Sequence, residues 1–240
     1  MELPSLVNGW ILDRYKRFFA DVELEDGRRV TAHVPNTGRM TGCWSPGAPV
    51  QLSHSDNPRR KLEWTLERVD MGAGWIGVNT HRVNAVVAEG IAAGEVPALA
   101  GYGTLRREVT PRALPGSSRL DLLLDDGPAE TAYVEVKNVT LLLGDALCFP
   151  DAVTQRGRKH LFELARLREM GCRAVILFAL NRPEGTFFRA ADEIDPQYAA
   201  ALQEVADKGV EVIALRLRHT PTGIEAAGPV PVCLEDAGAQ

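Results

Sequence analysis

The 240-residue sequence contains only four cysteines, and they are widely scattered. No C-x-x-C pair occurs, so the sequence predicts neither a zinc ribbon nor a disulfide framework. It lacks a cationic start followed by an apolar segment, and no run approaches the ~20 apolar residues that a membrane-spanning helix needs. Low-complexity segments and internal repeats at solenoid spacing are absent as well. These absences favour a reduced, cytoplasmic, globular protein with no membrane partner.

An excess of positive charge is also missing. The formal net charge is −5. Residues 1–80 carry ten Lys/Arg and ten Asp/Glu, whereas residues 81–240 carry 17 and 22. Any binding of nucleic acid therefore has to come from local basic patches rather than from the charge of the whole protein.

What the first 80 residues do contain is a series of short strands separated by turns. The patterns predict strands at 18–24, 29–34, 48–53, 62–69 and 75–78, the last of which would close the set. This many short strands predict a small β-barrel, for which an OB-like barrel is one candidate. The character of the sequence changes near Asn79-Thr80, so we expect one domain over 1–79 and a second over 80–240.

The second domain alternates strands and helices. Thr80 is a candidate N-cap for a helix that carries Val83, Val86, Val87 and Ile91. Strands are predicted at 119–124, 131–137, 173–180 and 210–217, and helices at about 153–170 and from Asp195-Pro196 to Lys208. The strand at 173–180 is apolar throughout, which is typical of burial on both faces. The fold class is therefore α/β (α+β overall), with the barrel followed by a mixed sheet.

The strongest chemical pattern lies on two consecutive strands of this second domain. Alternation along a strand puts Glu135 and Lys137 on one face, and Asp121 of the preceding strand falls nearly opposite Tyr133 or Glu135. Two such carboxylates can share a cation, and Mg²⁺ usually takes one or two carboxylates together with water and phosphate. Metal-assisted hydrolysis of a phosphodiester is the chemistry that fits. Glu-x-Lys on a strand is, however, more often an exposed charge pair.

Basic and polar residues elsewhere are candidates for contacts with DNA. On the helix that follows the Glu-x-Lys strand, Gln155 and Lys159 either face the site or belong to a solvated surface, and the sequence favours neither. In the first domain, cations interleave with aromatics or occupy a glycine-rich loop. The residues concerned are Arg14, Lys16, Arg17, Asn36, Thr37 and Arg39, with Arg59-Arg60-Lys61 as a second cluster. An ordinary solvated edge strand is the alternative, and His33, His54, His81 and His219 show no ligand spacing.

Taken together, these segments resemble the sugar fermentation stimulation protein A family. The matching segments are 14–18, 35–38, 40–43, 78–80, 118–121, 135–141 and 149–154, followed by Arg156-Gly157 and Lys159-His160. The resemblance covers nearly the whole chain. It implies an N-terminal OB-like domain that binds DNA and a C-terminal domain similar to PD-(D/E)XK nucleases, in a bacterial or archaeal protein linked to sugar (maltose) metabolism. It also implies that Asp121 is the Asp of the nuclease signature and that Glu135 and Lys137 are its E-x-K.

Three hypotheses follow for the function. The first is a Mg²⁺- or Mn²⁺-dependent deoxyribonuclease in which Asp121 and Glu135 hold the metal, helped by the Val136 carbonyl and by Glu89 or Glu108, and Lys137 positions the attacking water. The second is a non-catalytic DNA-binding transcriptional regulator that keeps the fold. The third is a salt-bridged hairpin in a protein that binds a small molecule or a partner. A homodimer would be unsurprising for a nuclease-like fold, but no segment demonstrates it, and no organic cofactor is predicted.

Overall fold

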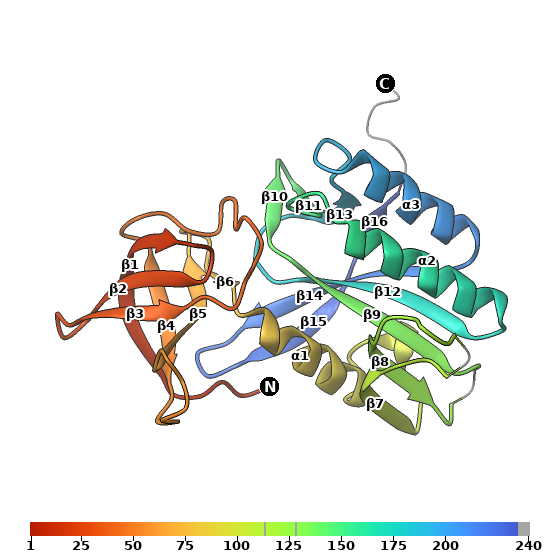
Figure 1. The fold of residues 1–240 in the computed structure, drawn as a ribbon, viewed down its shortest axis with the longest axis horizontal. Coiled ribbons are helices and arrows are strands. Elements are labelled where there is room, and N and C mark those ends of the chain that lie inside the picture. The colour runs from red at the N-terminus through yellow and green to blue at the C-terminus, as the bar shows by residue number, and fades with distance from the viewer. Residues whose placement is uncertain (113, 128, 235–240) are drawn as a thin grey trace.

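The computed structural model describes residues 1–112, 114–127 and 129–234. A red-to-orange barrel formed by the N-terminal strands lies beside a larger α/β unit (Figure 1). Helix α1 follows directly on the last strand of the barrel unit and leads the chain into the larger unit. Within the described residues, no helix is both long and apolar enough to cross a membrane.

The barrel is OB-like, as the sequence predicts. Its strands are β1 (Leu6–Tyr15), β2 (Phe19–Leu24), β3 (Arg29–His33), β4 (Pro49–His54), β5 (Trp64–Asp70) and β6 (Trp75–Gly77). They follow the order β3-β2-β1-β4-β5-β6, and β3 pairs in parallel with β5 at Ala32↔Trp64 and His33↔Thr65. This parallel pairing closes the barrel. The strand predicted at 75–78 is present as β6, the last strand of the set, and it extends the sheet beyond β5.

Strand β1 was not predicted, although it is central to the barrel. Its Asn8-Gly9 pair is a sequence that ordinarily favours a turn. The structure shows why glycine stands there. A Cβ added to Gly9 would lie 2.6 Å from the Glu23 carbonyl oxygen, so the close approach of β1 to β2 requires a residue without a side chain.

The larger unit is built on a mixed sheet. Its strands are β7 (Thr104–Val109), β8 (Leu120–Asp125), β9 (Ala132–Val139), β12 (Arg173–Leu180), β14 (Glu211–His219) and β15 (Ile224–Val230), in the order β15-β14-β12-β9-β8-β7. Strand β12 runs parallel to both β9 and β14. Its alternate residues enter two different cores, with Ile176 and Phe178 in one and Val175 and Leu177 in the other. The prediction of a strand buried on both faces is confirmed.

Helices cover both faces of this sheet. Helix α1 (Thr80–Ala92) packs against β8, β9 and β15, while α2 (Gln155–Glu169) packs against β9 and β12 on the other face and is joined there by α3 (Pro196–Asp207). Figure 1 shows α2 and α3 side by side above the sheet and α1 below it. The helices contribute to these cores the apolar residues that recur at helical spacing in the sequence, such as Val83, Val86 and Val87 of α1.

The helix starts correct two expectations. Asn79, not Thr80, is the N-cap of α1, because the Asn79 Oδ1 accepts a hydrogen bond from the His81 N–H. Helix α2 begins two residues later than expected, since Thr154 caps it by accepting from the Gly157 N–H. Asp195 caps α3 with Pro196 behind it, as predicted.

A second, small sheet also lies outside the prediction. It consists of β10 (Leu141–Leu143), β11 (Ala146–Phe149), β13 (Phe187–Ala190) and β16 (Val232–Cys233). The chain also contains a short 3₁₀ helix, η1 (Pro97–Leu99), between α1 and β7. Each of these strands has at most four residues. Segments this short carry too few alternations for a pattern to show.

Polar contacts tie the barrel to the larger unit. The Asp151 carboxylate accepts from the backbone N–H of Arg39 at 2.8 Å, and the Thr80 hydroxyl donates to the Pro35 carbonyl at 2.6 Å. Arg68, which is 1% exposed, donates to the carbonyls of Thr220 and Pro221. The first two contacts hold the barrel loop 35–40 against the segment after β11 and the first turn of α1, and the Arg68 contacts tie β5 to the turn between β14 and β15.

Candidate functional site

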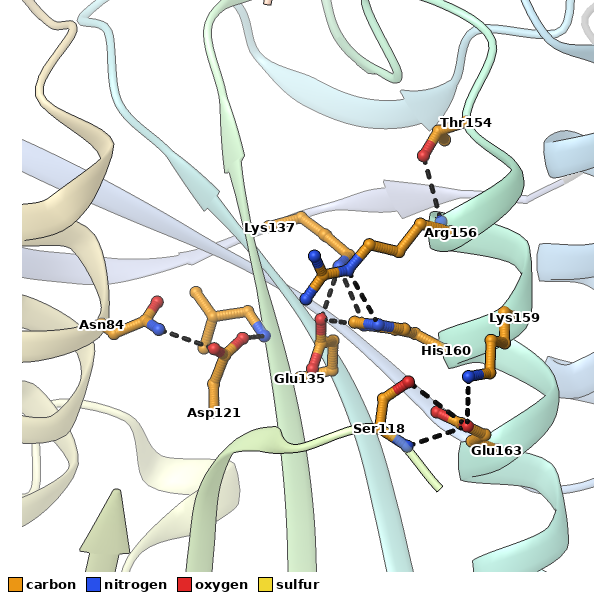
Figure 2. A network of polar contacts seen from close by, with 12 residues as sticks. Asn84, Ser118, Asp121, Glu135, Lys137, Thr154, Arg156, Lys159, His160 and Glu163 are labelled. Atoms are coloured by element: carbon orange, nitrogen blue, oxygen red, sulfur yellow. Dashed lines mark hydrogen bonds and ion pairs between the residues drawn. The ribbon is translucent and has the colours of Figure 1, made fainter. Parts of the chain in front are cut away.

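Asp121 and Glu135 meet where strands β8 and β9 separate. The antiparallel ladder ends at the pair Leu122↔Val134, and one residue further the Asp121 carboxylate accepts the Val136 N–H at 2.8 Å. The other oxygen of Asp121 accepts from the Asn84 amide of α1 at 2.7 Å. Asp121 is thus held by a neighbouring strand and by a helix, with its carboxylate beside Glu135 (Figure 2).

Glu135 is nearly buried, with 3% of its surface exposed. Its Oε1 contacts the Lys137 Nζ at 2.5 Å and is hydrogen-bonded to the His160 Nδ1. The other oxygen, Oε2, is buried and has no hydrogen-bond partner among the described residues. An anionic oxygen without a partner is costly in a protein interior, so its place in the molecule suits a ligand that supplies positive charge.

The two carboxyl groups have opposite pKa shifts. Burial, and then the charge of Glu135, raises the pKa of Asp121 to about 6. Burial would also raise the pKa of Glu135, but the hydrogen bond from His160 and the charge of Lys137 outweigh burial and leave that pKa below its usual range. A divalent cation beside both groups would favour the ionised form of Asp121.

A pocket of about 910 Å³ opens onto the two carboxylates. Its lining residues are Thr80, His81, Glu108, Arg119, Asp121, Glu135, Arg156 and His160. Lys137 stands at the inner side of Glu135 with its Nζ 3.5 Å from the His160 Nδ1, and the Arg156 Nε donates to the His160 Nε2 at 3.3 Å. The pocket is therefore lined by acidic residues of β8, β9 and β7, by Arg119, and by Arg156 and His160 of α2.

The donor set fits a hard divalent cation. Among the described residues, no group of three or more His, Cys, Asp and Glu side chains is close enough to hold a metal. Two carboxylates are nevertheless what Mg²⁺ commonly takes from a protein, because water and phosphate complete its shell. The unpaired Oε2 of Glu135 supplies an oxygen that no protein donor occupies among the described residues.

The two further glutamates considered from the sequence have different places. Glu108 lines the pocket, adopts a positive φ of 58° and pairs with Arg119, with 2.7 Å between Oε2 and Nε. Glu89 instead binds the N-terminal ammonium of Met1 at 2.8 Å. Glu108 is therefore a residue of this pocket and Glu89 is not.

Helix α2 presents residues to the site other than those the sequence singled out. His160 and Arg156 line the pocket, whereas Gln155 is exposed and absent from its lining. The Lys159 Nζ lies 3.5 Å from the Glu163 carboxylate, which also binds Ser118 (Figure 2). The i, i+4 spacing of Arg156 and His160 was visible in the sequence, but it does not tell which helix face meets β9.

Asn84 was missed altogether. It lies on α1, 37 residues before Asp121, and no local pattern marks an asparagine in a helix as the partner of a distant carboxylate.

Arg14 holds the barrel loop rather than reaching solvent. Its guanidinium donates to the carbonyls of Arg17, Asn36, Gly38 and Arg39 at 3.0–3.3 Å. Burial lowers the pKa of this arginine. Asn36 is buried at 7% exposure, and its Oδ1 accepts from the Gly38 N–H, so it too shapes the loop.

The remaining barrel candidates are exposed. Lys16 and Arg17 form the turn between β1 and β2 with positive φ values of 48° and 64°, and Thr37 and Arg39 lie on the loop that Arg14 organises. Thr37 and Thr80 line a pocket of about 180 Å³ between the barrel and the larger unit, and Thr80 also lines the carboxylate pocket. The exposed residues of this loop therefore lie on the same side as the site.

Two family models match consecutive parts of the chain. Residues 12–78 match the "SfsA N-terminal OB domain" and residues 81–223 match the "Sugar fermentation stimulation protein RE domain". The chain belongs to the sugar fermentation stimulation protein family. A homologue of that name from Syntrophotalea carbinolica is 48% identical over 98% of this chain and 100% of its own. One from Rhodospirillum centenum is 51% identical over 93% and 96%. The resemblance stated from the sequence is thereby confirmed.

A solved structure of a family member has the same fold. It is described as the structure of Pyrococcus furiosus SfsA in complex with Ca²⁺, and it is 28% identical to this chain with a TM-score of 0.86. The match covers 97% of this chain and 98% of the other. The barrel and the mixed sheet thus form a fold that this family member shares over nearly the whole chain.

Proposed function

We propose that this protein binds DNA and cleaves it at the Asp121–Glu135 site with the help of Mg²⁺ or Mn²⁺. The observation that carries the proposal is the pairing of the half-buried Asp121 with the buried Glu135 on adjacent strands, with an unpaired Glu135 oxygen and Lys137 beside them. The Ca²⁺ complex of the Pyrococcus furiosus relative supports a divalent cation in the family.

In this proposal Asp121 and Glu135 hold the cation, with the Val136 carbonyl as a third oxygen. The bound ion would lower the pKa of a coordinated water and neutralise charge at the phosphate. Lys137 orients the attacking water and offsets negative charge. His160 holds Glu135 through Oε1, which leaves Oε2 without a hydrogen-bond partner among the described residues.

The basic groups around the pocket support a polyanionic substrate. Arg119 and Arg156 line its rim, and the exposed Lys16, Arg17 and Arg39 lie on loops of the adjoining barrel. Cationic side chains placed around an acidic base would contact the phosphates that flank the scissile bond. We further propose that 1–79 and 80–240 act as separate domains, one gripping DNA and the other cutting it.

A DNA-binding regulator without catalysis is the second candidate function. The family name, which links relatives to sugar fermentation, favours it. Regulation of sugar (maltose) metabolism through DNA binding would need the same basic groups but not the carboxylates.

The test incubates supercoiled and single-stranded DNA with the protein in Mg²⁺, Mn²⁺ or EDTA, beside Lys137→Ala, Glu135→Gln and Asp121→Asn. We expect metal-dependent cutting that falls at least about 100-fold in each variant. Lys159→Ala is the matched control, because this exposed lysine pairs with Glu163 instead. Thermal unfolding checks that each variant is folded. DNA binding without cutting under any metal would establish the regulator and remove the catalytic roles.

A further inference from the structure

A second pocket, of about 350 Å³, lies on the barrel next to the first turn of α1. Its lining residues are His33, Ser53, Arg60, Thr65, Asn79, His81 and Arg82. We call it the Arg60 pocket. His33 comes from the end of β3, Arg60 from the loop between β4 and β5, and His81 from α1. The parallel pairing His33↔Thr65 that closes the barrel brings these elements together.

The lining of the Arg60 pocket is polar throughout and contains no carboxylate among the described residues. Glu67 is buried behind the wall of the Arg60 pocket, with 2% of its surface exposed, and both of its carboxylate oxygens accept hydrogen bonds. Its Oε1 accepts from Ser53 at 2.7 Å and from Arg82 at 2.8 Å, and its Oε2 accepts from Asn79 at 2.8 Å. Glu67 therefore neutralises Arg82 and organises the wall without presenting a negative charge to the pocket.

Arg60 has a neutral hydrogen-bond partner. Its Nη2 donates to the neutral Thr65 hydroxyl at 2.6 Å, and within the described residues no carboxylate lies at ion-pair distance from it. His33 faces the same space, where burial and then the charges of His81 and Arg60 lower its pKa. Arg60, His33 and His81 thus converge on this space, and of the lining groups Arg82 is the one that Glu67 neutralises.

The first turn of α1 adds to the positive electrostatic potential of the pocket. It carries His81 and Arg82 and no acidic residue, although the N-terminal end of a helix favours negative charge. Arg82 is paired with Glu67, so His81 is the residue of this turn that faces both the pocket and the helix N-terminus without an acidic partner among the described residues. The Thr65 hydroxyl accepts from Arg60 and keeps its own proton as a further donor for a tetrahedral oxyanion.

His81 also lines the pocket of Asp121 and Glu135, so the two pockets adjoin. We propose that the Arg60 pocket binds a backbone phosphate of the DNA strand whose scissile phosphate lies at Asp121 and Glu135. The pocket would therefore fix the path of the DNA strand from the barrel to the carboxylate site, and with it which phosphate of the strand lies at Asp121 and Glu135. This inference rests on the proposed function for the identity of the strand, but not for the chemistry of the pocket.

The test measures binding of labelled single-stranded and duplex DNA in EDTA, so that nothing is cut, at several salt concentrations. Arg60→Gln is expected to weaken binding about tenfold and to reduce the slope of log K against log salt by about one. Arg59→Gln is the matched control, because it removes the same charge from the neighbouring residue, which does not line the pocket. We expect it to change the affinity less than about twofold.

A second variant guards against a folding defect. His33→Gln keeps a hydrogen-bonding side chain but removes the imidazole donor from the pocket, and we expect it to weaken binding about threefold. Equal affinities for Arg60→Gln and Arg59→Gln would overturn the proposal, as would a wild-type protein that binds no DNA.

Inorganic phosphate separates the two sources of a phosphate group. If it shifts the imidazole NMR signals of His33 and His81 while Arg60→Gln leaves DNA binding unchanged, the pocket takes a free phosphate and the strand proposal is wrong. Cutting assays keep the two proposals distinct. A protein that binds DNA through Arg60 but never cuts would refute the nuclease function alone.

Discussion

The carboxylate site and the basic barrel loop use charged residues in opposite ways. Asp121 and Glu135 are held by side chains and one backbone N–H, and they point toward a pocket. Arg14, in contrast, donates through Nη1 and Nη2 to four backbone carbonyls of its own domain, while its buried Nε has no partner among the described residues. A charged residue on a strand has its direction set by alternation, whereas a residue beside a loop is free to turn inward and satisfy that loop.

This contrast separates two meanings of a charged motif. Charge that the fold leaves without a partner, as at Glu135 Oε2 and Arg60, indicates a ligand. A charged group whose hydrogen bonds go to the backbone of its own domain, as at Arg14, indicates a structural role. The following predictions test that distinction from the largest expected effect to the smallest.

Arg14→Ala should cost about 3 kcal/mol of stability, because it leaves partly buried carbonyls without their charged donor. Urea unfolding measures the change. Arg39→Ala, an exposed residue of the same loop, should stay within about 0.5 kcal/mol. If the two variants unfolded at the same urea concentration, Arg14 would be a surface residue available to DNA after all.

The two carboxylates should respond oppositely to neutralisation. In EDTA at pH 7, Asp121→Asn should stabilise the protein by on the order of 2 kcal/mol, because the folded state raises the pKa of Asp121 to about 6. Glu135→Gln should destabilise it by roughly 1–3 kcal/mol, because the folded state lowers the pKa of Glu135 through His160 and Lys137. Thermal unfolding would show both signs.

The pH dependence follows from the same shift. Between about pH 4 and pH 6 the folded Asp121 keeps a proton that the unfolded chain has released, so its contribution to stability falls as pH rises. Asp121→Asn should remove this decline in EDTA. An unchanged pH profile in the variant would mean that Asp121 has an ordinary pKa.

His160 acts in this account as a positioning residue for Glu135. His160→Gln should lower the affinity for Mn²⁺ about tenfold, as measured by calorimetry. His54→Gln, on the barrel surface, should leave that affinity unchanged. An unaltered affinity in His160→Gln would show that Glu135 needs no support from α2.

Lys16→Gln and Arg17→Gln should each reduce the salt slope of DNA binding by about one while leaving stability within about 0.5 kcal/mol. Their side chains are exposed on the β1–β2 turn. Lys159→Gln should change the slope less, since this lysine is partly neutralised by Glu163. Equal slopes for all the variants would place the DNA elsewhere on the molecule.

Much of the fold followed from local pattern. Continuous apolar residues predicted the burial of β12, and alternation predicted Tyr133, Glu135 and Lys137 on one face of β9. In the structure Tyr133 enters the core beside α2. The Asp195-Pro196 pair predicted the start of α3. Strand β1 was hidden by Asn8-Gly9, because the reason for Gly9 is the approach of β2, which no local pattern records.

The sequence by itself determined the residue types of the site and the strands that carry them, because the period of a strand is a local property. Only the tertiary structure brought Asn84 to Asp121 and His160 to Glu135. It also directed Arg14 to backbone carbonyls of the barrel loop and Arg60 to the Thr65 hydroxyl. These relations depend on how helices pack across the sheet and on how β3 closes onto β5. Side chains that are far apart in the chain meet through packing, and packing is decided by the whole core rather than by any one segment.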